Sequence, residues 1–268
     1  MDFHLHTTAS DGLLSPQALH AEVVRAGVAA WAVADHDTVD GWRALRGAPG
    51  LVAAVEATAG ADGREVHVVG LGINPDSPEL IALLAGNQAL RRQRIALLID
   101  RLPERLRRGL TVESVEQHAG PARPAALTRL HLARTLVATG KVANTRRVFA
   151  EFLGDEHAAD ADLPEFPQLF SVANTIRAAG GLAILAHPGQ HGTLAAIDRL
   201  MAAGLDGLEV RHPGLDRVLA AELDQRAAAA GWWCSAGSDL HFLGARTPGM
   251  CRLDDARRLR LTARLGLS

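Results

Sequence analysis

Two histidines near the start of the chain, His4 and His6, have the type and spacing of metal ligands. The stretch 2–6 has the pattern of a β-strand, and alternate side chains of an extended chain point to the same face. Both imidazoles therefore point one way, where they could bind the same divalent ion. Because short motifs often occur by chance, two ordinary surface histidines are the alternative for this pair alone.

Further polar side chains stand at or just after the ends of the other predicted strands. They are His36, Glu56, His187, Glu209, Asp239 and His241. In a β/α barrel the loops that follow the strands converge at one end and carry the active site. Isolated core histidines have no reason to occur at the same end of strand after strand. The pattern therefore favours one shared site over separate structural histidines.

The candidate ligands are too many for one ion and sufficient for two or three ions if a carboxylate bridges. They are His4, His6, Asp11, His36, Glu56, His67, His187, Asp239 and His241. Histidine with carboxylate and without thiolate suits Mn²⁺, Fe²⁺ or Zn²⁺ and argues against Ca²⁺. Three carboxylates facing three divalent ions leave a cationic cluster, which favours an anionic substrate such as a phosphate. Clusters of this kind also lower the pKa of bound water and align the attacking and leaving oxygens.

Motifs for other chemistries do not occur. The sequence contains no G-x-S-x-G, P-loop or G-x-G-x-x-G element. Neither a protein nucleophile nor a nucleotide cofactor is therefore predicted.

The elements that must position the ligands alternate between strand and helix. Apolar runs predict strands at 2–6, 30–34, 51–55, 65–73, 182–186, 205–210 and 232–236. A helix begins at Ser15-Pro16, with Ser as the N-cap and Pro in the first turn. Strands joined by helices form parallel βαβ units. Seven of them predict an α/β fold with a closed or nearly closed barrel.

The strand pattern stops between about 77 and 175, where helical spacing replaces it. We expect 1–99 and 166–268 to form the barrel with the metal site, and 100–165 to form a helical insertion that recognises substrate. Residues 91–147 contain thirteen Arg or Lys and four Asp or Glu, a net charge of +9 in a chain of −2 overall. A basic segment suits an anionic partner; a solvated arginine-rich helix face is the alternative, and we prefer it for 101–108.

Length and composition exclude several other classes. The 268 residues, 48% of them hydrophobic, suffice for one large α/β domain with an insertion. No apolar run is long enough to span a membrane, and the early strand pattern leaves no room for a signal peptide. Cys234 and Cys251 form no CxxC motif, which fits a reducing compartment. We expect a cytoplasmic protein without an obligatory protein partner.

Taken in order, the motifs resemble those of the PHP (polymerase and histidinol phosphatase) family of metallophosphoesterases. The matching segments run from the first residues nearly to the last: Asp2-x-His4-x-His6-Thr7, Asp11-Gly12, Asp35-His36-Asp37, Glu56 with His67, Ala186-His187-Pro188 and Gly237-Ser238-Asp239-x-His241. The resemblance implies a distorted (β/α)₇ barrel and three divalent metal ions, Mn²⁺ first, with Fe²⁺ or Zn²⁺ as alternatives.

The resemblance also implies how the ligands are shared among the ions. A first ion would be held by His4, His6, Glu56 and Asp239. Glu56 would bridge to a second ion, held also by His67 and His187. A third ion would be held by Asp11, His36 and His241. A hydroxide that bridges metal ions would then attack phosphorus.

Within the insertion, Arg129-x-His131-x-Ala133-Arg134 resembles the motif of the stand-alone subfamily that acts on nucleotides. Its members remove phosphate from 3′,5′-nucleotide bisphosphates or AMP, or degrade short RNA from the 5′ end. Arg129 and Arg134 could bind a phosphate that the metals do not hold, and His131 could add a donor. A helix-surface charge is the alternative for Arg134. His212 could orient the substrate, protonate the leaving group or simply pack at the rim.

One segment departs from this subfamily. After Phe149-x-x-Phe152-Leu153-Gly154 the subfamily usually continues with a glycine-lysine-proline-aromatic stretch, whereas residues 155–160 here are DEHAAD. The departure concerns substrate recognition by this loop and leaves the ligand set intact.

We therefore expect a metal-dependent phosphoesterase that hydrolyses phosphomonoesters of nucleotides: a 3′,5′-bisphosphate, AMP or the 5′ end of a short single-stranded RNA. A phosphatase of a small non-nucleotide substrate such as histidinol phosphate is one alternative, and it would use the same metals. A non-catalytic metal-binding module is the other. Loss of ligands would be the signature of that module, and all the candidate ligands are present.

Overall fold

The computed structural model describes residues 1–120, 123–154 and 163–267. Its centre is a seven-stranded sheet whose strands follow chain order: β1 (Asp2–Leu5), β2 (Trp31–Val33), β3 (Leu51–Ala61), β4 (Arg64–Leu71), β5 (Leu182–Leu185), β6 (Gly207–Arg211) and β7 (Trp233–Ala236). A bridge between Leu5 and Leu240 places the segment after β7 beside β1. The acidic segment 155–160 lies outside the described residues.

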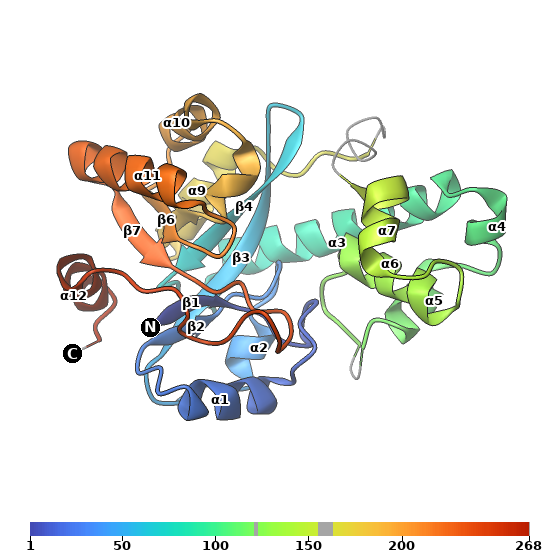
Figure 1. Ribbon diagram of the computed structural model, residues 1–268, viewed down its shortest axis with the longest axis horizontal. Coiled ribbons are helices and arrows are strands. Elements are labelled where there is room, and N and C mark those ends of the chain that lie inside the picture. The colour runs from blue at the N-terminus through green and yellow to red at the C-terminus, as the bar shows by residue number, and fades with distance from the viewer. Residues whose placement is uncertain (121–122, 155–162, 268) are drawn as a thin grey trace.

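Helices cover the sheet, and a second group of helices projects to one side of it (Figure 1). Around the sheet lie α1 (Pro16–Arg25), α2 (Asp40–Arg43), α9 (Leu169–Ala178), the 3₁₀ turn η2 (Pro188–His191), α10 (Leu194–Ala202), α11 (Arg217–Ala230) and α12 (Asp255–Arg264). The projecting group contains α4 (Glu104–Arg107), α5 (Val112–Gln117), α6 (Arg129–Ala138), α7 (Thr145–Val148) and the π-helical turn η1 (Phe149–Leu153). Among the described residues no helix is both long and apolar enough to cross a membrane.

The start of α1 follows from its sequence as expected. The Ser15 hydroxyl accepts a hydrogen bond from the amide of Ala18 at 3.2 Å, and Pro16 occupies the first helical position. A side-chain cap satisfies one of the amides that a helix N-terminus leaves without an intrahelical partner.

The sheet is not wholly parallel, which corrects the expectation of uninterrupted βαβ units. Strand β4 runs antiparallel to both β3 and β5. The connection from β3 to β4 is the two-residue turn Asp62-Gly63, whose φ values of 51° and 70° are both positive. Turns of this kind join antiparallel strands, because a parallel connection needs a crossover of a dozen or more residues.

The reversal of β4 explains how two predicted ligands meet. Strand β3 continues to Ala61, so Glu56 lies within the strand and not just beyond its end, as the sequence pattern had predicted. His67 is paired with Thr58 across the β3–β4 ladder, two residues from Glu56. Directly opposite residues of an antiparallel pair share a face, as do alternate residues along a strand. Glu56 and His67 therefore point to the same side of the sheet.

The long helix α3 (Pro78–Arg101) joins the two groups of helices. Its first turns contribute Leu80 and Leu84 to the main hydrophobic core, which the sheet and its surrounding helices form. Its last turns contribute Ile95 and Leu98 to a separate core within the projecting helices. The boundary predicted at 99/100 thus falls inside a continuous helix of 24 residues.

A buried ion pair fastens α3 to the sheet. The Asp37 carboxylate accepts hydrogen bonds from Arg91 Nε at 2.6 Å and Asn87 Nδ2 at 2.7 Å, both on α3. It also accepts from the amide and hydroxyl of Thr58 on β3, at 2.9 and 2.7 Å. Asp37 adopts a left-handed backbone conformation with φ of 46° and has no exposed surface.

Replacing this carboxylate tests how strongly the pair stabilises the fold. Asp37→Asn keeps the size of the side chain, and asparagine tolerates the left-handed conformation. The variant leaves the Arg91 guanidinium buried beside a neutral group, so we expect the free energy of unfolding to fall by about 3 kcal/mol. Urea denaturation of the metal-free protein measures this loss. Asp100→Asn, on an exposed position of the same helix, should change stability by less than about 0.5 kcal/mol, and equal stability of the two variants would contradict the prediction.

Candidate metal centre

The predicted ligands from both ends of the chain converge in three overlapping groups. Within each group one ligand atom per residue lies within 4.8 Å of the others. The groups are His6, Asp11, His36 and His241; His4, His6 and Asp239; and His36, Glu56 and His67. The strand ends and the loops after them supply these side chains. His187 and Asp239 take left-handed backbone conformations there, with φ of 32° and 50°.

Glu56 lies at the middle of the cluster and presents its two oxygens to different histidines. Oε1 lies 2.9 Å from His187 Nε2 and 3.2 Å from His67 Nδ1. Oε2 lies 3.3 Å from His4 Nε2 and 3.4 Å from His6 Nε2. This division matches the bridging role that the family resemblance implies for Glu56. One difference is that Oε2 also lies 2.9 Å from His36 Nδ1, which was assigned to the third ion.

Asp239 divides its oxygens in a similar way. Oδ1 faces the histidines, 3.3 Å from both His6 Nε2 and His241 Nδ1. Oδ2 is held from behind by Arg246 Nη1 at 2.7 Å and by His212 Nε2 at 3.4 Å. Arg246 was not predicted from the sequence, because it belongs to no motif. It reaches Asp239 only through the path of the loop after β7.

The orientation of the ligand atoms fits metal ions. Within the described residues, several fully buried polar atoms of the cluster make no hydrogen bond: His4 Nε2, His6 Nε2, Asp11 Oδ1, Glu56 Oε2 and His67 Nδ1. Buried polar atoms of folded proteins are nearly always paired, so a group of orphaned atoms calls for a partner. Imidazole nitrogens and carboxylate oxygens that converge without a thiolate are ligands for Mn²⁺, Fe²⁺ or Zn²⁺.

Carboxylates outside the ligand set contact three of the histidines, two through their rings and His187 through its amide. Glu209 Oε1 lies 2.9 Å from His4 Nδ1, and its Oε2 accepts the amide of His187 at 2.6 Å. Glu65 Oε1 lies 3.0 Å from His67 Nε2. Such contacts fix the orientation of a metal-binding imidazole and the nitrogen it offers. The sequence analysis missed Glu65, although its position two residues before His67 on one strand was an available signal.

The electrostatics of the cluster keep its carboxylates ionised. Burial raises the pKa of a carboxyl, but the surrounding histidines outweigh burial and hold the pKa values of Asp11, Glu56 and Asp239 well below their usual range. Burial lowers the pKa of His6 to about 3, with a further contribution from His241. Although burial also opposes the charge on His67, Glu56 and Glu65 raise its pKa to about 10.

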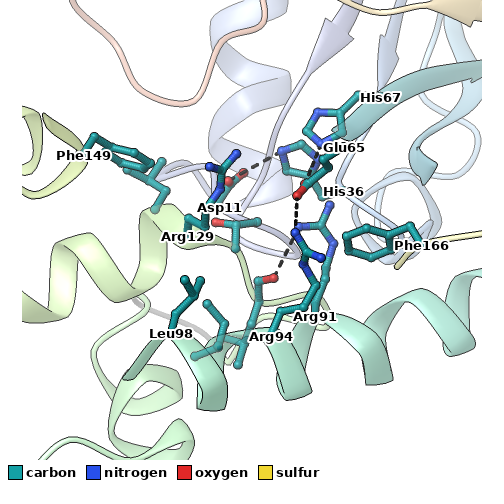
Figure 2. A pocket seen from close by; sticks show the side chains of 14 residues that line it. Asp11, His36, Glu65, His67, Arg91, Arg94, Leu98, Arg129, Phe149 and Phe166 are labelled. Carbon is teal, nitrogen blue, oxygen red and sulfur yellow. Dashed lines mark hydrogen bonds and ion pairs between the residues drawn. The ribbon is translucent and has the colours of Figure 1, made fainter. Parts of the chain in front are cut away.

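A cavity opens beside the cluster toward the projecting helices (Figure 2). Asp11, His36 and His67 form its metal-side wall, and Arg91, Arg94 and Arg129 line it together with the rings of Phe149 and Phe166. The Arg94 guanidinium lies over the Phe166 ring at 4.8 Å and contacts Glu65 at 3.3 Å. The cavity thus combines a predicted metal wall with cationic and aromatic surfaces.

The residues predicted to contact substrate occupy three different settings. Arg129 lines the cavity, and its Nη1 also donates to the carbonyl of Leu153 at 3.1 Å. His131 and Arg134 do not line it; their side chains donate to the carbonyls of Ser10 and Asp11. This differs from the prediction, because helical spacing turns His131 into the protein interior, where its side chain has no exposed surface. His212 is buried against Asp239.

Comparisons with known proteins agree with this geometry. No protein-family model matches the sequence. The chain is 34% identical to a 5′-3′ exoribonuclease of Haemophilus influenzae, covering 90% of this chain and 89% of that one. It is 32% identical to a 3′,5′-nucleoside bisphosphate phosphatase of Chromobacterium violaceum, covering 91% and 88%. It is 30% identical to a phosphoribosyl 1,2-cyclic phosphate 1,2-diphosphodiesterase of Eggerthella lenta, covering 92% and 96%.

Solved structures share the whole fold. A protein from Bifidobacterium adolescentis described as a metal-dependent phosphoesterase matches 98% of this chain and 95% of its own, with a TM-score of 0.85 and 27% identity. An amidohydrolase from Chromobacterium violaceum with bound sulfate and no metal matches 98% and 96%, with a TM-score of 0.83 and 28% identity. Fold and site together therefore define a phosphoester hydrolase. The chain belongs to the PHP family of metal-dependent phosphoesterases, as its motifs had indicated.

The contact of Arg246 with Asp239 predicts an effect on metal affinity. Arg246→Ala removes the shorter of the two contacts to Asp239 Oδ2 and leaves only that of His212, so the carboxylate is held less firmly toward the histidines. We expect Mn²⁺ binding about tenfold weaker, as for other residues that support metal ligands. The electron paramagnetic resonance signal of free Mn²⁺ measures it. Arg246→Lys should recover part of the affinity, and Arg217→Ala, at an exposed position of α11, should not change it. Wild-type affinity in Arg246→Ala would show that the contact is incidental.

The buried His131 predicts an acid-sensitive fold. Burial lowers its pKa from 6.5 to about 4. Between pH 6.5 and pH 4, His131 binds a proton in the unfolded chain but not in the folded one. The free energy of unfolding is therefore at its full value above pH 6.5 and falls as the pH drops toward 4. The loss attributable to this group is on the order of 3 kcal/mol.

Chemical denaturation between about pH 7 and 4.5 tests this linkage. His131→Asn should show a shallower fall in unfolding free energy with acidification than the wild type does. His118→Asn, at an exposed histidine, should keep the wild-type dependence. Parallel curves for all three proteins would assign the acid sensitivity to other groups.

Proposed function

We propose that the protein hydrolyses phosphomonoesters of nucleotides, with a 3′,5′-nucleotide bisphosphate, AMP or the 5′ end of a short RNA as substrate. The observation that supports this most directly is the cavity, in which the predicted metal wall faces arginine and aromatic side chains. Guanidinium groups bind phosphate through paired hydrogen bonds, and aromatic rings bind bases by stacking. A nucleotide carries both groups in one molecule.

The names of the relatives support the same substrate class. The names of the relatives refer to RNA, to a nucleoside 3′,5′-bisphosphate and to a phosphoribosyl cyclic phosphate, all of which are phosphate esters of a sugar. The basic character of residues 91–147 suits such polyanions. Histidinol phosphate has one phosphate and an imidazole in place of a nucleobase, so it offers fewer groups to the arginines and rings of this cavity.

The chain's own residues define roles in this chemistry. When bound, divalent ions lower the pKa of water and stabilise negative charge on the phosphoryl oxygens. Glu56 and Asp239 are ionised and would hold divalent ions together with the histidines around them. Arg129 faces the cavity from α6 and would bind the second phosphate or the ribose side of the substrate.

His212 serves the site as a support in this proposal. Its Nδ1 accepts the amide of Gly214 at 2.9 Å, which places its proton on Nε2, the atom facing Asp239. A neutral imidazole in this tautomer donates a hydrogen bond to Asp239 and holds no further proton to release. We therefore assign it to orienting Asp239 and not to protonating the leaving group.

Several finer features complete the proposal. The site would hold three ions, Mn²⁺ in preference to Fe²⁺ or Zn²⁺, in a protein that acts in the cytoplasm. The sheet would close into a distorted (β/α)₇ barrel; the hydrogen bonds from His6 to Leu240 at 3.0 Å and from Asp239 to His4 at 2.9 Å support closure. Residues 100–165 would form a substrate-recognising insertion, and the separate core of the projecting helices supports this division.

Release of phosphate, or of a nucleotide in the case of the RNA, by Mn²⁺-loaded protein tests the proposed function. Four substrates are compared: adenosine 3′,5′-bisphosphate, AMP, histidinol phosphate and a 5′-phosphorylated RNA trimer. We expect turnover of the bisphosphate or the trimer to exceed that of histidinol phosphate. The reverse order would transfer the function to small non-nucleotide phosphates. No release from any of them by protein that binds Mn²⁺ would favour a non-catalytic module.

Arg129 offers a more specific prediction. Arg129→Ala should raise KM for the bisphosphate about tenfold while kcat stays within about twofold, because a charge-assisted hydrogen bond to phosphate contributes about 1.5 kcal/mol. Arg64→Ala, in the exposed β3–β4 hairpin, is the matched control and should leave both constants unchanged. Initial rates with the bisphosphate and with AMP measure the effect. An equal rise in KM for both substrates would argue against a separate second-phosphate contact.

A further inference from the structure

The loop that carries Asp11 is held on one side by the sheet. The Asp35 carboxylate accepts hydrogen bonds from the Thr7 amide at 2.7 Å and the Ser10 hydroxyl at 2.6 Å. On the loop's far side the amide of Leu13 donates to the carbonyl of His241 at 2.7 Å. These hydrogen bonds fix both ends of the loop. They do not involve the carbonyl groups between Thr7 and Gly12.

Three successive carbonyls of this loop accept hydrogen bonds from α6 and from the segment just before it. The carbonyl of Ala9 accepts the amide of Ala125 at 2.9 Å. The carbonyl of Ser10 lies 3.1 Å from His131 Nε2, and that of Asp11 lies 2.7 Å from Arg134 Nη1. Residues 125–134 and 9–11 are more than a hundred positions apart in the sequence, so these three hydrogen bonds form only in the folded protein.

Both ring nitrogens of His131 form hydrogen bonds within the protein. Nδ1 accepts the amide of Thr128 at 3.0 Å and so caps the start of α6. The proton must then reside on Nε2, which donates to the carbonyl of Ser10. The ring thus links the first turn of α6 to the loop and offers no nitrogen to a substrate.

The other side of the same loop meets the metal centre. Asp11 Oδ1 lies 3.1 Å from His241 Nε2, and Oδ2 lies 3.7 Å from His36 Nε2. The backbone of Asp11 is therefore held by α6, while its carboxylate faces the two histidines with which it is predicted to hold an ion. A shift of the backbone would move the carboxylate with it.

We propose that His131 and Arg134 are positioning residues that hold the Asp11 loop in place, so that α6 sets the affinity of the metal position formed by Asp11, His36 and His241. This inference uses one part of the proposed function, that the cluster binds divalent ions. It gives the projecting helices a role in assembling the metal centre in addition to binding substrate.

Calorimetric titration of metal-free protein with Mn²⁺, without substrate, tests the inference. We expect Arg134→Ala and His131→Asn to weaken one class of site at least about tenfold and to leave the other classes unchanged. His131→Asn keeps a side-chain acceptor for the cap of α6 but is too short to reach Ser10. Arg134→Lys and His131→Gln, which retain a donor at the needed distance, should recover part of the affinity.

The control is Arg64→Ala, which removes an exposed arginine of the β3–β4 hairpin, away from both the loop and the cavity. It should keep wild-type affinity at every class of site. Unchanged Mn²⁺ binding in Arg134→Ala, with a higher KM, would overturn the inference and make Arg134 a substrate ligand. Equal weakening of all classes of site, together with a lower melting temperature, would also overturn it and assign a general structural role.

The titration separates this inference from the proposed function. Wild-type protein that binds Mn²⁺ but hydrolyses none of the four substrates would contradict the function and leave the positioning role open to confirmation by the variants. Wild-type protein that binds no Mn²⁺ would contradict both.

Discussion

The burial of charged groups around Glu56 is the constraint on which the rest of the structure depends. Glu56 and Asp11 are almost completely removed from solvent, and both are ionised. An isolated buried carboxylate is strongly unfavourable, so the fold must supply cationic partners at close range. Histidines such as His67 and His241, whose pKa values are raised to about 10 and 9, meet part of this need, and several buried polar atoms of the cluster remain without a hydrogen bond. A divalent metal ion is a partner that would satisfy them together.

Around this centre a second ring of contacts holds the ligands in place. Glu209 and Glu65 fix imidazoles, Arg246 and His212 fix Asp239, and Asp35 fixes the loop of Asp11. These residues come from strands, from the loops after them and from the segment beyond β7. Since each contact constrains a different ligand, the geometry of the site is spread over most of the chain.

The projecting helices share in the site and do not merely adjoin it. Helix α3 carries Arg91, which pairs with Asp37 beside the sheet and also lines the cavity. Helix α6 carries Arg129 at the cavity and Arg134 at the backbone of Asp11. The same group of helices thus lines the cavity and contacts the loop of Asp11, which links the two parts of the site physically.

The sequence by itself determined the ligand types, their order along the chain and the family. Alternation and strand-end position are local properties, so His4, His6 and His241 could be grouped without coordinates. The sequence pattern also located the strands to within a few residues, apart from the continuation of β3 beyond Glu56. It missed the antiparallel direction of β4, because the Asp62-Gly63 turn was taken for part of a longer connection.

Only the tertiary structure decided which side chains support the candidate ligands and which line the cavity. His131 and Arg134 sit in a motif that is typical of nucleotide binding, yet the structure directs them to the carbonyls of Ser10 and Asp11. Arg246 and Glu65 carry no motif and still contact the cluster. Each of these contacts, apart from that of Glu65, joins residues brought together by a loop or by packing between distant elements. The spacing of residues in a helix determines which face of the helix a side chain lies on. Only the packing of the helix against the rest of the protein determines which residues that face contacts.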